Sequence, residues 1–138
     1  MTGPSHEQAI DALVERFFAF FDNRDGAVPR LADLASCFAD KATIARRSGA
    51  GTELYTFGEF AAPRIDLLTR GALRDVHEWE SAATTHVFDG IATRTSRYAK
   101  AGLLEGKPYG GSGTKCFLFV EVEAGWRIAS VVWVDDAA

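Results

Sequence analysis

The 138-residue sequence changes its hydrophobic period once, near residue 72, and this change constrains the fold more than any other feature. Before it, apolar residues recur at helical spacing, and after it apolar and polar residues alternate as they do in strands. The sequence contains no internal repeat, low-complexity tract or linker. We therefore expect one domain over residues 1–138, with an α+β order in which three helices pack on a curved, mostly antiparallel sheet.

Two helices are predicted before residue 40. Ser5 and Gln8 form a capping box that opens a helix over about residues 5–23, in which apolar residues form a stripe at helical spacing. Pro29 is tolerated in a first helical turn, so a second helix is expected to begin near it. Short strands are expected at 43–45 and 54–55.

A third helix is predicted over about residues 56–71. The capping box of Thr56 and Glu59 opens it, and Gly71 is a natural C-cap. Pro63 lies inside this helix, where a proline removes one hydrogen bond and costs roughly 3 kcal/mol. We therefore expect a kink or a break at this residue.

The alternation after residue 73 predicts a four-stranded antiparallel meander. Asp89-Gly90 is a strong hairpin signal, and Ala124-Gly125 is a second tight turn. The glycine-rich stretch 106–113 is expected to be a mobile loop at the lip of a pocket. It is not a phosphate-binding loop, because Lys115 opens a strand rather than a helix. The expected strands are 75–87, 91–101, 115–123 and 126–134.

Both faces of the last two predicted strands are apolar, whereas the helices can cover only one of them. A large exposed apolar face usually marks an interface, so we expect a homodimer that pairs sheet against sheet. Shielding of that face by a bulge or by the C-terminal tail is the alternative. The face assigned to the dimer carries Phe117, Phe119, Val131 and Trp133. The opposite face carries Cys116, Leu118, Val120, Val122, Ile128, Val132 and Val134.

The composition excludes several classes of partner. The formal net charge is −4 and no dense basic stripe is present, so we expect no nucleic acid partner. No apolar run is long enough for a membrane span, and the start of the chain lacks the features of a signal peptide. Cys37 and Cys116 lie in apolar segments, which suits a cytoplasmic protein with buried, inert thiols. The histidines lack metal-ligand spacing, and we expect neither a metal nor another cofactor.

Two motifs give the chain a resemblance to a known superfamily. Cys37-Phe38-Ala39-Asp40-Lys41-Ala42-Thr43-Ile44 follows an aromatic-rich helix, and Gly125-Trp126-Arg127-Ile128 lies in the last hairpin. With these motifs the chain resembles the nuclear transport factor 2-like superfamily over nearly its whole length, and in particular its SnoaL-like and polyketide-cyclase-like domains. The resemblance implies an α+β cone that encloses a pocket. It implies no single reaction, because members include isomerases, dehydratases, epoxide hydrolases, cyclases and noncatalytic association domains.

The known reactions of this superfamily make demands that the sequence does not meet. The roles of ketosteroid isomerase would fall near Phe17, Arg46 and Leu118, none of which supplies a tyrosine donor, an aspartate base or a protonated aspartate. Limonene-epoxide-hydrolase-like chemistry needs an aspartate beside Arg97, and none lies next to it on its own strand or directly across from it. Scytalone-dehydratase-like chemistry needs two histidines, but positions 77 and 86 point to opposite faces of a strand unless a bulge intervenes.

Polar residues that strand alternation aims inward form the candidate site. The expected catalytic residues are Glu80 as a general base, Arg97 as a fork for a carboxylate, phosphate or enolate oxygen, and His86 as a further candidate base. A structural ion pair between Glu80 and Arg97 across two strands is the alternative interpretation. The expected substrate-binding residues are Phe17, Arg46, Tyr55, Phe60, Glu78, Thr93, Thr95, Leu118, Val120, Ser130 and Val132.

Three functions are compatible with the sequence. The chain is a cofactor-independent isomerase, dehydratase or cyclase for a small organic molecule, a noncatalytic ligand-binding domain, or a homodimerisation module whose pocket is filled by its own aromatic side chains. The first two need an open cavity with charge on its wall, and the third needs a cavity that is packed solid.

Overall fold

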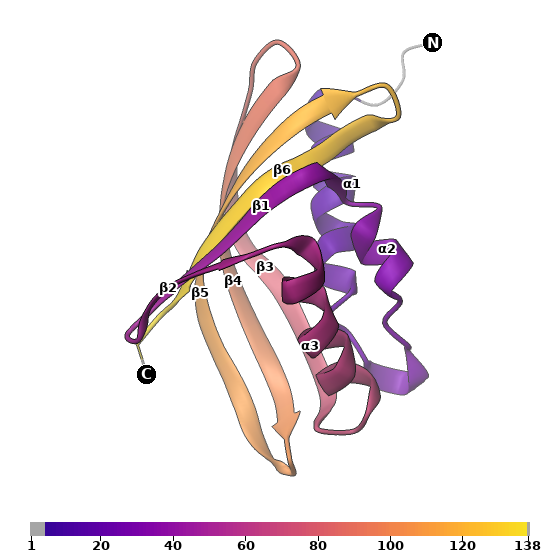
Figure 1. Ribbon diagram of the computed structural model, residues 1–138, viewed down its shortest axis with the longest axis vertical. Helices are drawn as coiled ribbons and strands as arrows, with labels where there is room; N and C mark the ends of the chain where they lie inside the picture. The colour runs from indigo at the N-terminus through magenta and orange to yellow at the C-terminus, as the bar shows by residue number, and fades with distance from the viewer. Residues whose placement is uncertain (1–4, 138) are drawn as a thin grey trace.

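A curved sheet with three α-helices on one side makes up the computed structural model, which describes residues 5–137 (Figure 1). Residues 1–4 lie outside this range, and the expected absence of a signal peptide rests partly on them. The helices are α1 (His6–Ala19), α2 (Leu31–Ala35) and α3 (Phe57–Thr69), with a 3₁₀ turn at Arg24–Gly26. The strands are β1 (Phe38–Ser48), β2 (Gly51–Tyr55), β3 (Leu73–Val87), β4 (Ile91–Leu104), β5 (Lys107–Val122) and β6 (Gly125–Asp135). The predicted α+β order is confirmed.

Both predicted capping boxes are present at the helix starts. The Ser5 hydroxyl accepts a hydrogen bond from the Gln8 amide at 3.1 Å, and the Thr56 hydroxyl accepts one from the Glu59 amide at 3.2 Å. The helix ends differ from the prediction. α1 stops at Ala19, four residues early, and α2 is only five residues long. Within residues 5–137, no helix has both the length and the apolar character needed to cross a membrane.

The α3 helix continues through Pro63, so of the two predicted alternatives, a kink or a break, the break is wrong. Phe60 and Ala61 are buried before the proline and Leu68 is buried after it. Because both halves of the helix contribute to the core, packing outweighs the hydrogen bond that the proline removes.

The six strands form a single sheet in the order β2-β1-β6-β5-β4-β3. Neighbouring strands are antiparallel except for β1 and β6, which pair in parallel. The predicted meander therefore corresponds to β3–β6, with one turn at the predicted Asp89-Gly90 and the other at Glu123-Ala124, one residue before the predicted Ala124-Gly125. The β1–β2 hairpin extends the sheet beyond β6 and is much longer than the two short strands expected from the sequence.

All of the glycine-rich stretch except Gly106 lies within β5, so the stretch is not a loop, which corrects the prediction. The turn between β4 and β5 is instead formed by Glu105 and Gly106, which both have positive φ. Gly113 is required by a close approach, because a Cβ atom there would overlap the Tyr98 hydroxyl and the Val134 carbonyl. The glycine thus allows the Tyr98 ring to lie across the sheet.

The two faces of β5 and β6 are the reverse of the prediction. Phe117, Phe119 and Val131 are at most 2% exposed and face the helices, and the Phe117 ring centroid lies 5.3 Å from that of Phe17 in α1. Trp133 faces the same side. These four residues are therefore core residues and cannot form the expected dimer face.

Bulges explain why the faces could not be followed by counting alternate residues. Phe119 pairs with Ile128, but Leu118 pairs with Ser130, so one residue of β6 is skipped between these pairs. Each such insertion transfers the following side chains to the other face of the sheet. As a result Ile128 is fully buried while Val132, assigned to the same face, is 45% exposed.

Candidate functional site

A cavity of about 240 Å³ lies between α3 and the inward face of the sheet. Its wall combines an apolar floor with charged groups from β1, β3, β4, β5 and β6. The apolar and aromatic lining residues are Phe21, Phe60, Pro63, Leu67, Leu68, Leu73, Val76, Tyr98, Tyr109 and Trp133. The charged lining residues are Arg46, Arg64, Glu78, Lys100, Lys115 and Asp135. Four of these are basic and two are acidic, so the wall carries a net positive charge in a chain whose net charge is −4.

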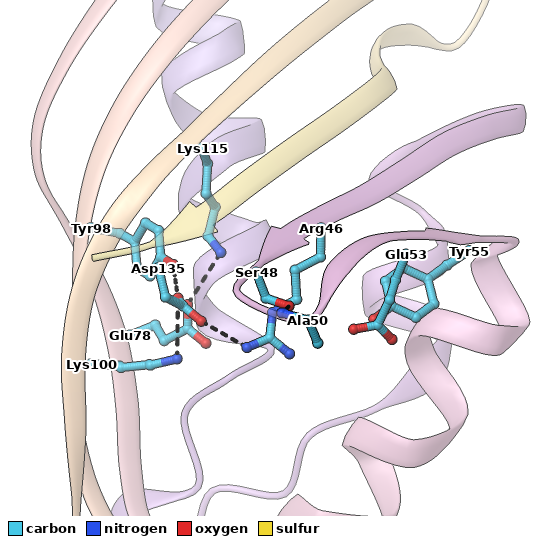
Figure 2. A network of polar contacts seen from close by, with 10 residues as sticks. All are labelled: Arg46, Ser48, Ala50, Glu53, Tyr55, Glu78, Tyr98, Lys100, Lys115 and Asp135. Carbon is cyan, nitrogen blue, oxygen red and sulfur yellow. Dashed lines mark hydrogen bonds and ion pairs between the residues drawn. The ribbon is translucent and has the colours of Figure 1, made fainter. Parts of the chain in front are cut away.

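Asp135, the last residue of β6, is the centre of a polar cluster on this wall (Figure 2). Its carboxylate accepts a hydrogen bond from the Tyr98 hydroxyl. Arg46 reaches it from β1, with Nη2 3.1 Å from Oδ2, and Lys100 reaches it from β4, with Nζ 3.4 Å from Oδ1. The carboxylate thus holds two cations and a phenol at one end of the cavity.

The cluster fixes the protonation of its members. Burial favours the neutral form of Asp135, but the hydrogen bond from Tyr98 and the charges of Lys100 and Arg46 prevail and lower its pKa. Burial and the adjacent Asp135 carboxylate both raise the pKa of Tyr98. At neutral pH the site therefore contains a carboxylate anion and a protonated phenol.

Lys115 and Glu78 form a second, deeper pair. The Lys115 Nζ atom lies 3.6 Å from Glu78 Oε1, and the two side chains are 7% and 13% exposed. Nζ also lies 3.9 Å from the centroid of the Tyr98 ring and 5.2 Å from that of Trp133. Burial lowers the pKa of the Lys115 amine, a shift that the Glu78 carboxylate opposes and Lys100 reinforces.

Two buried polar atoms on the cavity wall have no hydrogen-bond partner among the described residues. They are Arg46 Nε, a donor, and Glu78 Oε1, an acceptor. Leaving such an atom unsatisfied costs about 1–3 kcal/mol, and most buried polar groups in native proteins are paired. Arg46 and Glu78 both line the cavity, so a bound molecule that reached these two atoms would meet one donor and one acceptor that no described residue satisfies.

Glu80 belongs to a different cluster, beneath α1. The guanidinium of Arg94 binds both Glu80 oxygens, and its Nη1 atom lies 2.5 Å from Asp11 Oδ1 on α1. Ser96 also donates to Glu80. The predicted Glu80–Arg97 pair is absent because a bulge between Glu80 and Ala82 sets Glu80 opposite Tyr98, so that Glu80 and Arg97 lie on opposite faces of the sheet. Glu80 does not line the cavity, so its position does not support a catalytic role there.

Arg97 and His86 point away from the cavity as well. Arg97 is exposed and donates to Thr114 and to Asp136 on the outer face of the sheet. His86 is exposed, and its strand partner is Thr93. The bulge in β3 brings His77 and His86 to the same face, opposite Ala101 and Thr93, but this is the outer face.

Three of the expected substrate-binding residues do line the cavity, namely Arg46, Phe60 and Glu78. Tyr55 lies next to it and stacks on Trp133 with ring centroids 6.1 Å apart, whereas Phe17 is buried in the core. The remaining six lie on the outer face of the sheet because of the reversed strand faces: Thr93, Thr95, Leu118, Val120, Ser130 and Val132. Leu118, to which the comparison with ketosteroid isomerase assigned a role, also lies on the outer face and cannot reach the cavity. Its neighbours Phe117 and Phe119 face inward, but phenylalanine has no proton to donate.

The sequence prediction missed Tyr98, Lys100, Lys115 and Asp135. Two signals were available. A glycine inside a strand marks the close approach of another group. Gly113 therefore indicated that the face of β5 that carries Gly113 and Lys115 packs against the rest of the protein. The larger aromatic side chains also share a face with Lys115, and such residues are usually buried.

No group of three or more His, Cys, Asp or Glu side chains suited to a metal ion occurs between residues 5 and 137. The thiols are separated, with Cys37 buried in the core and Cys116 exposed on the outer face, which corrects the expectation that Cys116 is buried. The titratable groups of the cavity wall are two amines, two guanidiniums, two carboxylates and two phenols.

No protein-family model matches the chain, and no curated protein matches it in sequence. Solved structures do match its fold. An NTF2-like superfamily protein from Salmonella enterica is 15% identical, with a TM-score of 0.76 over 96% of this chain and 92% of that one. A type 2 hexachlorocyclohexane dehydrochlorinase (LinA) is 15% identical, with a TM-score of 0.71 over 95% and 85%. A putative calcium/calmodulin-dependent protein kinase II association domain from Xanthomonas campestris is 13% identical, with a TM-score of 0.64 over 98% and 89%.

Proposed function

Because the chain has a nuclear transport factor 2-like fold, a scaffold shared by enzymes and by association domains, we propose that its cavity binds a small organic anion with an apolar body. We propose further that it catalyses proton transfer next to a carbonyl group, as a cofactor-independent isomerase or lyase does. The observation that carries the proposal is the pair of unsatisfied buried atoms, Arg46 Nε and Glu78 Oε1, on one cavity wall.

The anion is favoured by the charge and shape of the wall. An arginine donor that is already buried gains a charge-assisted hydrogen bond when it meets a carboxylate or an enolate oxygen. Lys100 adds a second positive charge beside Arg46, since both contact Asp135. The apolar floor, which includes Phe60 and Trp133, suits an aromatic or unsaturated body.

Proton transfer is assigned to Glu78. Its Oε1 atom accepts no hydrogen bond from the described residues and has only the ion pair with Lys115, and Glu78 lines the cavity, which makes it the candidate to take a proton from a bound molecule. Asp135 is less suited, because its lowered pKa and three partners make it a weak base. We assign Asp135 the role of orienting Arg46 and Lys100. A noncatalytic binding domain is the alternative, and it would share the anion site without turnover.

Calorimetric titration with benzoate tests the anion site. We expect wild-type protein to bind benzoate and Arg46→Met to bind it roughly tenfold or more weakly, because a hydrogen bond to a charged group contributes about 1.5–3 kcal/mol. Arg47→Met is the matched control. Arg47 is the next residue of the same strand, is exposed, and contacts Thr52. Equal losses in the two variants, or no binding by wild-type protein, would refute the anion site.

We also propose that a second copy of the chain covers the outer face of the sheet. With Phe117, Phe119, Val131 and Trp133 in the core, the large apolar residues left exposed on β5 and β6 are Leu118 at 52%, Val122 at 42%, Val132 at 45% and Val134 at 42%. Cys116 lies among them. Such a face is self-complementary across a two-fold axis, and Arg97 and Asp136 at its end contribute charges of both signs.

Sedimentation velocity tests this pairing. We expect wild-type protein to sediment as a dimer and Val132→Lys as a monomer, because the lysine would place a charge in the centre of the contact. Val28→Lys serves as the control, since Val28 is 71% exposed and lies between the 3₁₀ turn and α2, outside β5 and β6. A monomeric wild-type protein would show that the face is simply solvated.

A further inference from the structure

Lys115 differs from the other charged residues that line the cavity because it is buried, and aromatic rings surround its amine. Its Nζ atom lies 3.9 Å from the Tyr98 ring centroid, 5.2 Å from that of Trp133, and 5.9 Å from those of Phe17 and Phe18. The side chain is only 7% exposed and lines the cavity. A lysine placed only for solubility or for charge balance would extend into water.

The acidic neighbour of Lys115 does not hold it by a hydrogen bond. Glu78 Oε1 is 3.6 Å from Nζ, beyond hydrogen-bond distance, and it is one of the atoms without a partner. Lys100, Asp135 and Arg46 face the same space from β4, β6 and β1. A buried amine next to other cations is the environment in which lysines act as nucleophiles in proteins.

From this placement we infer that Lys115 is an amine nucleophile that forms a covalent imine with the carbonyl group of an aldehyde or ketone bound in the cavity. The inference deepens the proposed function and rests on it, since it names the carbonyl compound as the substrate class. Burial of the amine, which lowers its pKa, increases the fraction of the reactive neutral form at neutral pH.

The chemistry balances without an oxidant, a reductant or a cofactor. The nitrogen lone pair forms a bond to the carbonyl carbon, the carbonyl electron pair moves to oxygen, and that oxygen takes up a proton. The nitrogen then expels the hydroxyl group, which leaves as water after a second protonation, and a carbon–nitrogen double bond remains. Glu78, beside the amine, accepts the one proton that nitrogen releases and passes it to the carbonyl oxygen, and the solvent supplies the second proton, so the positive charge remains on the imine nitrogen. The resulting cationic imine acidifies the adjacent C–H bond, which makes the proton transfer assigned to Glu78 easier.

Reductive trapping tests the inference on the full-length protein. Phenylpyruvate, an anionic aromatic ketone, and benzaldehyde, a neutral aromatic aldehyde, are each incubated with the protein and cyanoborohydride at neutral pH. We expect intact-mass analysis to show one reduced adduct and peptide mapping to place it on Lys115. Lys115→Met should lose this adduct, whereas Lys41→Met and Lys107→Met, at exposed positions, should retain it.

The wild-type peptide map alone is decisive if Lys115→Met fails to fold. Adducts at Lys41 and Lys107 with Lys115 unmodified, or no adduct with either probe, would overturn the inference. Benzoate binding together with that result would leave the proposed anion site standing. A benzaldehyde adduct on Lys115 in a protein that does not bind benzoate would support the amine chemistry and refute the anion site.

Discussion

Replacing Phe117 with alanine is expected to lower the free energy of unfolding by about 3–5 kcal/mol, because the cavity left by a buried phenylalanine cannot fully collapse. The side chain is 1% exposed. Its ring centroid lies 5.3 Å from that of Phe17 and 5.6 Å from that of Phe119, so the substitution removes contacts both to α1 and along β5. Chemical denaturation followed by circular dichroism measures the change.

Phe88→Ala is the control for this experiment. Phe88 lies in the turn between β3 and β4 and is 59% exposed, so its removal should change stability by less than about 0.5 kcal/mol. A loss at Phe117 as small as that at Phe88 would mean that the faces of β5 are assigned the wrong way round. The cavity built on the same face, with Lys115 in its wall, would then be wrong as well.

Glu78→Gln is expected to slow enzyme-catalysed proton exchange by roughly 10²–10⁴-fold, the usual contribution of a general base. The probe is deuterium uptake from heavy water at the carbon next to the ketone of phenylpyruvate, followed by NMR. The glutamine has nearly the same shape but cannot accept the proton, so benzoate binding should persist. The substitution therefore separates catalysis from binding.

The control for Glu78 is Glu53→Gln. Glu53 is an exposed carboxylate on β2 that accepts a hydrogen bond from Tyr55 and does not line the cavity. Its loss should leave proton exchange unchanged. If wild-type protein binds benzoate but does not accelerate exchange, or if Glu78→Gln exchanges as fast as wild type, the noncatalytic binding domain becomes the correct description.

Local signals in the sequence predicted the elements of the fold well. The capping residues Ser5 and Thr56 mark helix starts whose hydrogen bonds form within four residues, and Asp89-Gly90 marks a hairpin in the same local way. These features depend on the chemistry of a few neighbouring residues, so a single sequence contains them. Pro63 shows the limit, because the burial that keeps α3 intact comes from the rest of the molecule.

The candidate site was predicted only in part, because it depends on strand register. Arg46 and Glu78 were identified correctly as cavity residues, each as an inward residue of its own strand. Glu80 and Arg97 were not, since the bulge after Glu80 shifts the pairing between β3 and β4 by one residue. A bulge leaves little trace in a sequence, yet it exchanges the two faces of the strand and with them every polar residue.

The charge around Asp135 could not have been predicted by counting along one strand. Arg46 and Lys100, which meet its carboxylate, come from β1 and β4, and these strands lie on opposite sides of β6 in the sheet. Only the order β2-β1-β6-β5-β4-β3, with its parallel β1–β6 pair, brings them to one cavity. Sequence neighbours and hairpins contain no information about that parallel contact.

A crystal structure of the protein with benzoate would test the central claim most directly. We predict that the benzoate ring lies on the apolar floor beside Phe60 and Trp133, with a carboxylate oxygen within hydrogen-bond distance of Arg46 Nε. An empty cavity at saturating benzoate, or a cavity closed by Arg46 and Glu78 bonding to other protein groups, would contradict it.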